Sequence, residues 1–406
     1  MTSEERREIR YQRRKKRRQE KRKKYESEQH FSEVFSYKNL YKSYLKCRRG
    51  VAWKSSTQKY ISQAPLNVYR TYEQLKKGTY KSKGFYEFDL YERGKKRHIR
   101  SVTIDERVVQ KCLCDNSLVP AVTRSFIYDN GASMEGKGYH FAIRRIVGHL
   151  RRHYRKHGTK GYVLLFDFSK FFDNVSHKIV QDVLNNKFED EKLLKIQMHF
   201  VNAFGDCGMG LGSQISQTLA LASADKLDHA IKENMRIQGY GRYMDDGYLI
   251  HESKEYLQQC LAEIKKICDE LEITLNFKKT QIVKLTHGFT WLKCRFYLLE
   301  SGKVVKKIYK RSVTKERQKI KKLHKLYKLG RLELSSIHDC VQSWISYALQ
   351  FDATKTVVNL IRQLIALFGV QDTKKLVRTK KLRHNSIRQK MRYIQYLTHH
   401  LDMIGV

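Results

Sequence analysis

Three aspartates are the residues of this sequence whose type and spacing best support catalysis. Asp167 ends an apolar run that begins at Tyr162, while Asp245 and Asp246 stand together 78 residues later (245 − 167 = 78). Adjacent carboxylates repel each other, so an isolated Asp-Asp pair usually marks a solvated turn. A divalent cation gives a sharper explanation, because Mg²⁺ is held by one or two carboxylates together with substrate phosphates. The aspartates therefore predict a two-metal site for phosphoryl transfer.

The segments around the aspartates predict the elements that position them. A continuous apolar run predicts a buried strand that ends at Asp167, and two short runs flank the Asp245-Asp246 pair as the strands of a hairpin. A Gly-rich segment, 210–217, lies between them and leads into a helix. The expected strands are 162–167, 239–242 and 248–250, and the expected helices begin near Ser176 and span 218–234.

Further elements follow from periodicity on either side. Alternation of Tyr86, Phe88 and Leu90 with acidic residues predicts a β-hairpin over 84–104, followed by a helix that Asp105 could cap. Aromatic and basic residues interleave over 31–80, which predicts small helices with an aromatic core, although stacking on bases is the alternative. Downstream we expect a helix over 257–271, a strand over 274–283, a basic helix over 315–329 ending at Gly330, and a helix capped by Ser335 or Ser336.

Composition limits the class of protein. The 406 residues include 82 Lys plus Arg against 41 Asp plus Glu, a net charge of +41, so we expect a polyanionic partner. With 41% hydrophobic residues the chain can bury a core. Residues 1–24 hold 13 Lys/Arg and 4 Glu, which predicts a solvated arm or one that folds onto RNA phosphates. No run predicts a membrane span, no apolar leader is visible, and a cytoplasmic location is expected. The eight scattered cysteines predict no zinc site.

The ordered motifs together resemble a bacterial reverse transcriptase of the retroelement type. Tyr243-Met-Asp-Asp246 is similar to the catalytic hairpin of that family, 162–173 to its other metal-binding strand, and Gly212–Gln217 to its GxxxS segment. Residues 289–296 resemble its primer-grip hairpin, so a hairpin is expected there. The resemblance implies an α+β right-hand polymerase fold with fingers, a palm of antiparallel sheet with helices, and a helical thumb. The implied divisions are a basic N-terminal extension (1–50), fingers (51–160), palm (161–295), thumb (296–375) and a basic C-terminal tail (376–406).

The same resemblance implies roles for individual residues. Asp167, Asp245 and Asp246 are implied to be catalytic and to bind two Mg²⁺ ions, with Mn²⁺ as an alternative. Phe172 falls where the family places an aromatic gate against the ribose 2′-hydroxyl, which implies dNTP use. The remaining residues implied to contact the nucleotide are Gly212, Gln217, Arg97, Lys96, Arg107 and Lys279. The implied partners are an RNA template, most simply a dedicated structured RNA, the DNA product, and an accessory protein or a second copy.

Ser216-Gln217 bears on the type of reverse transcriptase. Most retron, intron and retroviral relatives have Ser-Pro here, whereas GxxxSQ is similar to the enzymes of diversity-generating retroelements. An antiviral defence reverse transcriptase acting with a noncoding RNA is the first alternative. A non-catalytic, maturase-like RNA-binding factor is the second, although it predicts damaged metal ligands. A template-independent or protein-primed DNA synthesiser would carry the same catalytic residues.

Overall fold

The computed structural model describes residues 3–92 and 95–377, which fall into two compact units. Unit 1 contains Met1–Ile146, Phe166–Leu249 and Glu255–Gln281, and unit 2 contains Val147–Leu165, Ile250–Lys254 and Ile282–Val406. All but the first two residues of the predicted basic C-terminal tail, 376–406, lie outside the described residues. The divisions expected for fingers, palm and thumb stay predictions.

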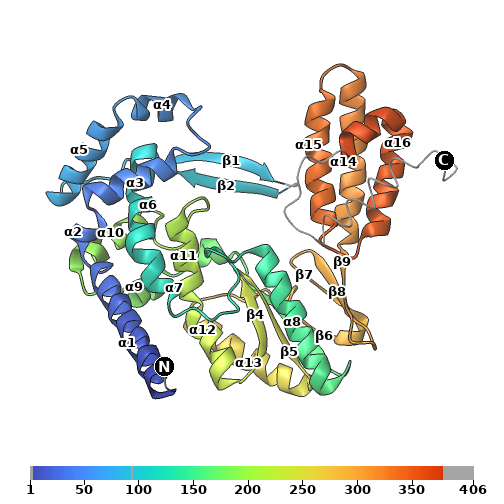
Figure 1. Ribbon diagram of the computed structural model, residues 1–406, viewed down its shortest axis with the longest axis horizontal. Coiled ribbons are helices and arrows are strands. Elements are labelled where there is room, and N and C mark those ends of the chain that lie inside the picture. The colour runs from blue at the N-terminus through green and yellow to red at the C-terminus, as the bar shows by residue number, and fades with distance from the viewer. Residues whose placement is uncertain (1–2, 93–94, 378–406) are drawn as a thin grey trace. The chain divides into compact units, whose positions relative to one another are not determined.

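The N-terminal part of unit 1 is helical, as the interleaved aromatic and basic residues predict (Figure 1). Helix α3 packs on α5 and α6 through buried residues that include Leu40, Val68 and Val109. Tyr44 and Tyr60 are buried with them, so part of the tyrosine set serves the core. The elements are α1 (Ser3–Ser27), α2 (Phe31–Val34), α3 (Tyr37–Cys47), α4 (Ser55–Ile61) and α5 (Ala64–Lys76).

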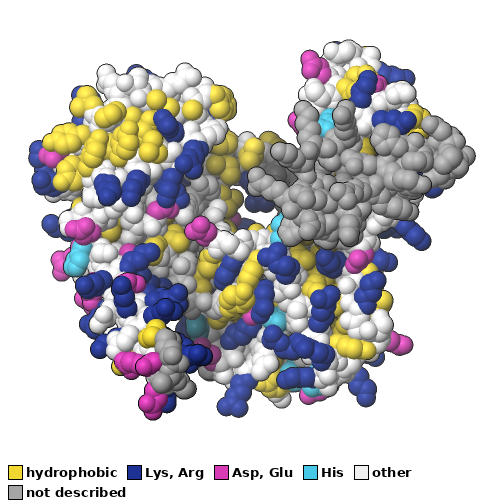
Figure 2. Space-filling model, in the orientation of Figure 1, with side chains coloured by type: hydrophobic (Ala, Val, Ile, Leu, Met, Phe, Trp, Pro, Cys, Tyr) yellow, Lys and Arg dark blue, Asp and Glu magenta, His cyan; other side chains and the backbone are white. Residues whose placement is uncertain are grey.

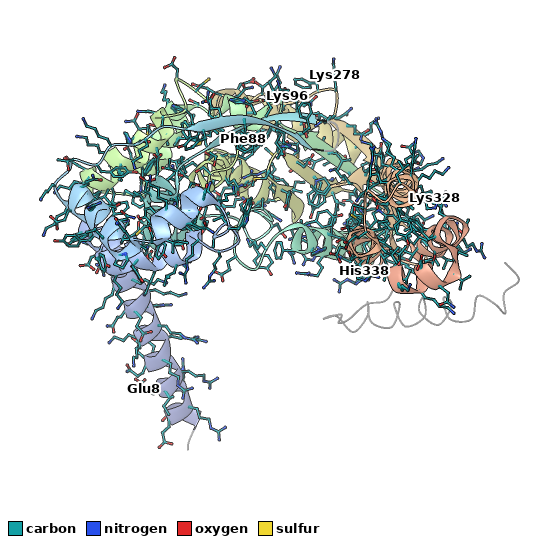
Figure 3. The ribbon with its side chains drawn as sticks, turned by 90° about the horizontal axis from the view of Figure 1, so that it is seen from above. Glu8, Phe88, Lys96, Lys278, Lys328 and His338 are labelled. Carbon is teal, nitrogen blue, oxygen red and sulfur yellow. The ribbon has the colours of Figure 1, made fainter. Side chains whose placement is uncertain are left out.

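The basic arm is a long helix, α1, whose C-terminal end contacts the rest of unit 1. Its side chains are exposed from Glu4 through Lys24, and Glu8 lies near the end that projects away (Figure 3). The Arg124 guanidinium lies 4.3 Å from the centre of the Tyr25 ring, and it also forms an ion pair with Glu28. The side-chain amide of Gln29 donates to the backbone carbonyl of Lys187 at 2.7 Å. These contacts hold the root of the helix while its basic length stays open to solvent.

The predicted hairpin is confirmed as β1 (Tyr86–Glu92) paired antiparallel with β2 (Lys95–Ser101). The register sets Phe88 opposite Ile99 and Leu90 opposite Arg97, so these four residues share one face. The helix that follows is α6 (Ile104–Leu113), whose N-cap is Thr103. The prediction that Asp105 caps this helix is wrong, because its carboxylate lies in the first turn and pairs with Lys83 at 2.5 Å. The chain continues through a π-helical turn (Cys114–Leu118) into α7 (Val119–Thr123).

A four-stranded sheet in the order β4-β5-β3-β6 carries the aspartates. The predicted strands are confirmed, and the helix expected near Ser176 begins at His177 with Ser176 as its N-cap. The strands are β3 (Tyr162–Asp167), β4 (Gly239–Tyr243), β5 (Asp246–His251) and β6 (Gln281–Lys284). The helices are α8 (Tyr139–His157), α9 (His177–Asn185), α10 (Glu191–Asn202), α11 (Gln214–Ser223), α12 (Asp225–His229) and α13 (Lys254–Glu270).

Helix α11 lies at the centre of unit 1 and follows directly from the Gly-rich segment. Ser213 caps it by accepting a hydrogen bond from the amide of Ile215, so it begins four residues before the expected start at 218. After Gln217 its residues are apolar or small on all sides, which suits a helix packed against several others. It contacts α6, α7, α9 and α12.

A fully buried ion pair lies beneath the hairpin formed by β4 and β5. The Arg242 guanidinium donates to both carboxylate oxygens of Asp228, at 2.7 and 2.6 Å, and neither side chain is exposed. Tyr240 also donates its hydroxyl to Asp228. A third bond runs from Arg242 to the carbonyl of Leu221 at 3.1 Å. Burial opposes ionisation of Arg242, but Asp228 outweighs it and raises the guanidinium pKa further.

The part of unit 2 after residue 288 includes a small sheet and the helices α14, α15 and α16. Its strands, β7 (Phe289–Trp291), β8 (Cys294–Leu298) and β9 (Val304–Ile308), pair antiparallel in chain order, which confirms the predicted hairpin. Helix α16 packs against both α14 and α15. Gly330, at φ +68°, follows the end of α14, whereas Glu333 and not Ser335 or Ser336 is the N-cap of α15. The helices are α14 (Lys310–Lys328), α15 (Leu334–Ala348) and α16 (Thr354–Val377). Within the described ranges, no helix combines the length and apolar character that crossing a bilayer requires.

The buried pair predicts a large and local effect on stability. Asp228→Ala leaves the Arg242 charge buried without its carboxylate, so we expect a loss of about 3–5 kcal/mol in the free energy of unfolding. Lys226→Ala on the same helix removes an exposed pair with Glu270 and should cost less than about 1 kcal/mol. Urea denaturation followed by circular dichroism compares the two variants. Equal losses would contradict this account of the core.

Candidate active site

Backbone pairing brings the distant aspartates together. The amide of Phe168, the residue after Asp167, donates to the carbonyl of Asp245 at 3.1 Å. Next to this contact β5 passes very close to β3. A Cβ added at Gly247 would lie only 2.2 Å from the ring of Phe166. A glycine directly after the Asp-Asp pair is therefore required for the approach. These contacts bring Asp167, Asp245 and Asp246 together, as the sequence predicts.

The turn that carries Asp245 has a strained backbone held by a buried cation. Met244 has a φ of +56°, in the left-handed region that non-glycine residues seldom adopt. Arg242 donates to the Met244 carbonyl at 2.8 Å, using a guanidinium already fixed by Asp228. The buried ion pair thus fixes the turn that presents Asp245 and Asp246.

The carboxylates perturb one another. Burial and then the charges of Asp245 and Asp167 raise the pKa of Asp246 to about 7. Burial, followed by the charge of Asp167, also raises the pKa of Asp245. Asp167 itself is only 4% exposed. Three acidic groups are therefore held where ionising all of them is unfavourable, unless positive charge joins them.

One lysine and one amide already contact Asp167. The Lys279 ammonium donates to both oxygens of Asp167 at 2.8 Å, and the side-chain amide of Asn276 donates to one of them at 3.2 Å. Burial acts to lower the pKa of Lys279, but the hydrogen bonds to Asp167 and the charges of the aspartates outweigh it and raise the pKa. Lys279 therefore contacts a carboxylate of the predicted site, and its role toward the nucleotide stays a prediction.

The strand expected over 274–283 is only partly right. The chain pairs at Leu275 with Phe168, then turns, since the amides of Lys279 and Thr280 both donate to the Asn276 carbonyl. Regular pairing resumes only at β6. This turn takes the place of the middle of the expected strand, and it directs the side chains of Asn276 and Lys279 toward Asp167.

The donor set fits a divalent cation of the Mg²⁺ type. Hard carboxylate oxygens are the ligands that Mg²⁺ prefers, and it keeps open positions for water and phosphate. Within residues 3–92 and 95–377, no group of three or more His, Cys, Asp or Glu side chains is arranged as a metal cage. Such a cage is not needed for an ion shared with a nucleotide, and the mutual repulsion of Asp167, Asp245 and Asp246 favours an added cation. Metal binding by these residues stays a prediction.

Phe172 and Gly212, both predicted to contact the nucleotide, lie in unit 1. Phe172 is half-buried, contacts Phe171 edge-on at 5.9 Å, and has its carbonyl bound by the amide of Met209 at 2.7 Å. It is not a fully enclosed core aromatic. Gly212 has a φ of +111°, and a Cβ there would lie 3.6 Å from Ile99. The Gly-rich segment therefore adjoins the apolar face of the β1–β2 hairpin.

The polar part of the Gly-rich segment is also engaged. The Gln217 side-chain carbonyl accepts a hydrogen bond from the Ser133 hydroxyl at 2.9 Å, and the Gln217 backbone amide donates to the Ser213 carbonyl at 3.3 Å. Ser216 is completely buried. A proline in place of Gln217 would lack both interactions.

The three cations expected to hold the triphosphate have different surroundings. Arg97 is on the face of the hairpin shared with Ile99, which adjoins Gly212. Lys96 is on the opposite face and pairs with Asp89 at 2.9 Å. Arg107 donates to the Ser101 hydroxyl at 3.0 Å. The geometry therefore favours Arg97 over Lys96 and Arg107, and the nucleotide role of each stays a prediction.

Sequence reasoning missed the residues that support the aspartates. Arg242, Asp228, Asn276 and Gly247 were not identified from the sequence, although each contacts or orients part of the site. A signal existed for Arg242, because a charged residue in a buried strand beside Tyr243 requires a partner. No local pattern identifies Asp228 as that partner.

The structure brings the three aspartates together, and comparison with known proteins identifies the family. The model of the reverse transcriptase (RNA-dependent DNA polymerase) family matches residues 76–317, more than half of the chain. The chain belongs to the reverse transcriptase family, whose members are nucleotidyltransferases. The matched region contains every residue predicted for the site. The right-hand polymerase fold expected from the sequence is confirmed.

Solved structures similar to this chain include two telomerases. One is telomerase from Candida albicans in complex with the TWJ fragment of telomeric RNA, at 10% identity and a TM-score of 0.42, covering 78% of this chain and 66% of that one. The other is apo telomerase from Candida tropicalis truncated from the C-terminal domain, at 12% identity and a TM-score of 0.42, covering 55% of each chain. No curated protein matches.

The Lys279 contact predicts a stability effect that divalent metal reverses. Lys279→Met removes the cation that Asp167 now contacts, so the metal-free protein should lose about 1 kcal/mol, a modest value because Lys279 is half-exposed. Added Mg²⁺ should stabilise this variant more than the wild type, because the ion meets no competing ammonium. Thermal unfolding with EDTA or Mg²⁺ measures both effects. Lys278→Met, at an exposed neighbour, is the control and should show neither.

Proposed function

We propose that this protein is a Mg²⁺-dependent RNA-directed DNA polymerase that copies a dedicated structured RNA into cDNA within a diversity-generating retroelement. The observation that carries the polymerase activity is the convergence of Asp167, Asp245 and Asp246 on adjacent strands. Family membership supports the same activity. An intact carboxylate set also argues against a role limited to RNA binding.

The reaction joins the 3′-hydroxyl of a primer to the α-phosphorus of a dNTP. A new P–O bond forms, the bond between the α-phosphorus and the bridging oxygen breaks, and pyrophosphate leaves. Two divalent ions, when bound, neutralise charge on the transferring phosphoryl group and lower the pKa of the attacking hydroxyl. Asp167 and Asp245 would hold them, and Asp246 would support the set. Arg97 would orient the triphosphate, while Lys279 can leave Asp167 for the phosphates.

Selection of dNTPs would fall to Phe172. Its half-buried ring leaves part of its surface available beside the sugar, and the Met209 amide fixes its backbone. A ribose 2′-hydroxyl that meets an aromatic ring loses its hydrogen bonds to water without replacement. The protein would therefore prefer DNA precursors.

The choice of a diversity-generating element is supported by Gln217. This side chain links the start of α11 to the loop at Ser133, a contact that the Ser-Pro relatives could not make. A structured RNA partner is supported by the charge of +41 and by the open basic length of α1. Phosphate contacts from such a surface would give binding that weakens steeply with salt.

Replacement of one aspartate tests the activity directly. Asp245→Asn keeps the shape of the side chain but removes its charge, so extension of a DNA primer on an RNA template should fall by about 10²-fold or more. Asp167→Asn should also be impaired. Asp173→Asn, at an exposed aspartate of the same segment, should retain activity. Full extension by folded Asp245→Asn would refute the site assignment, and error-rich copying of one repeat would distinguish a diversity-generating element from a defence enzyme.

Replacement of Phe172 tests the sugar gate. Phe172→Ala opens space beside the 2′-carbon, so the preference for dNTPs over NTPs should fall by about tenfold or more. Phe172→Tyr keeps the ring and should keep the preference. Single-nucleotide insertion kinetics with dNTP and NTP pairs give the ratio. An unchanged ratio in the alanine variant would return Phe172 to a packing role.

A further inference from the structure

Four tyrosines form a continuous row on the surface of α3 and α5, outside the residues that match the family. Tyr41 stacks with Tyr37 at 6.1 Å between ring centres, Tyr37 meets Tyr69 at 6.4 Å, and Tyr69 meets Tyr72 at 6.3 Å. We call these residues the tyrosine row. The family match begins at residue 76, so the reverse transcriptase domain assigns the row no role.

The tyrosine row is open to solvent, unlike the neighbouring tyrosines of the core. Tyr37 is 37% exposed and Tyr69 is 52% exposed, whereas Tyr44 and Tyr60, which continue the chain of ring contacts inward, are buried. Figure 2 shows hydrophobic side chains gathered over α3–α5 with Lys and Arg beside them. The core therefore uses the inner tyrosines and leaves the outer ones free for another contact.

Basic side chains surround the tyrosine row. Lys38 and Lys42 on α3, and Arg70 and Lys76 on α5, are all exposed, and no ion pair of theirs is seen among the described residues. The Lys76 ammonium lies 5.9 Å from the centre of the Tyr72 ring. Glu73, the acidic residue of this stretch of α5, already pairs with Lys77 at 3.3 Å. The surface thus combines π faces with uncompensated positive charge.

This combination favours nucleic acid over protein as the occupant. The cores of protein interfaces are depleted in lysine, whereas sites for single-stranded nucleic acid place cations along the backbone and aromatic rings beneath the bases. Bases within a duplex are already stacked, so the rings suit an unpaired strand. RNA is the single strand that a reverse transcriptase meets before synthesis.

We propose that the tyrosine row is a binding platform for an unpaired segment of the RNA, separate from the catalytic aspartates. The choice of RNA rests on the proposed function, while the platform itself rests on Tyr37, Tyr69 and their neighbours. Bases stack on the outer rings, and Lys38, Lys42 and Arg70 contact phosphates. The platform would hold a flanking part of the RNA while another part occupies the polymerase site.

The test uses paired substitutions that separate stacking from simple apolar packing. Tyr37→Ala with Tyr69→Ala removes two rings, Tyr37→Leu with Tyr69→Leu keeps apolar volume, and Tyr37→Phe with Tyr69→Phe keeps the rings. Each full-length variant is titrated, in EDTA and without dNTPs, against an unstructured oligoribonucleotide of about 16 nucleotides. Melting curves confirm that the exposed substitutions leave the fold intact.

We expect the alanine and leucine pairs to bind roughly thirtyfold more weakly and the phenylalanine pair to bind as the wild type does. The salt dependence should be unchanged, because no phosphate contact is lost. Ultraviolet crosslinking of the wild type should map RNA to peptides of α3 and α5. Asp245→Asn should bind normally, so a failure of the platform is distinguishable from a failure of catalysis.

Four results would overturn the proposal. The first is equal binding by the alanine and phenylalanine pairs. The second is an equal loss of affinity for a fully paired RNA duplex, which would show that stacking on unpaired bases is not the interaction. The third is normal RNA binding by the alanine pair together with lost binding of a copurifying protein, which would make the row a protein-docking surface. Tighter binding of single-stranded DNA than of RNA would likewise reject RNA as the occupant.

Discussion

Repulsion among three neighbouring carboxylates is the constraint on which the rest of unit 1 depends. Asp167, Asp245 and Asp246 are partly or fully buried. Like charges repel each other more strongly there than in water. The protein meets this cost with positive charge from two directions. Lys279 contacts Asp167 from the solvent side, and Arg242, bound to Asp228, holds the turn from beneath. A substrate and its metal ions would extend the same compensation during the reaction.

The constraint explains several otherwise separate features. Gly247 is needed because β5 must approach Phe166 closely enough to set the aspartates side by side. The left-handed Met244 is tolerated because a buried guanidinium binds its carbonyl. The strand after α13 is interrupted because its turn presents Asn276 and Lys279. The chain as a whole is strongly basic, with a net charge of +41, which would attract nucleic acid from a distance. The negative charge of the three aspartates would then be neutralised by the metal ions.

The sequence predicted local features well and long-range partners poorly. The β1–β2 hairpin, the start of α9 at Ser176 and the strand ending at Asp167 follow from alternation, capping and apolar runs, which act over a few residues. Thr103 displaced Asp105 as a cap because helix ends shift easily by one or two residues. The pairing of Arg242 with Asp228, and of Lys279 with Asp167, depends on how distant segments meet, so no local pattern contains it. The same limit left open whether Tyr37 and Tyr69 belong to the core or to the surface.

The central claim is that these three aspartates make DNA from RNA. Sequencing the nucleic acids that copurify with the wild type and with Asp245→Asn, each produced at equal level in the native host, tests it most directly. The account predicts equal amounts of one RNA with both proteins, and DNA complementary to that RNA with the wild type alone. Equal amounts of that DNA with Asp245→Asn would contradict it.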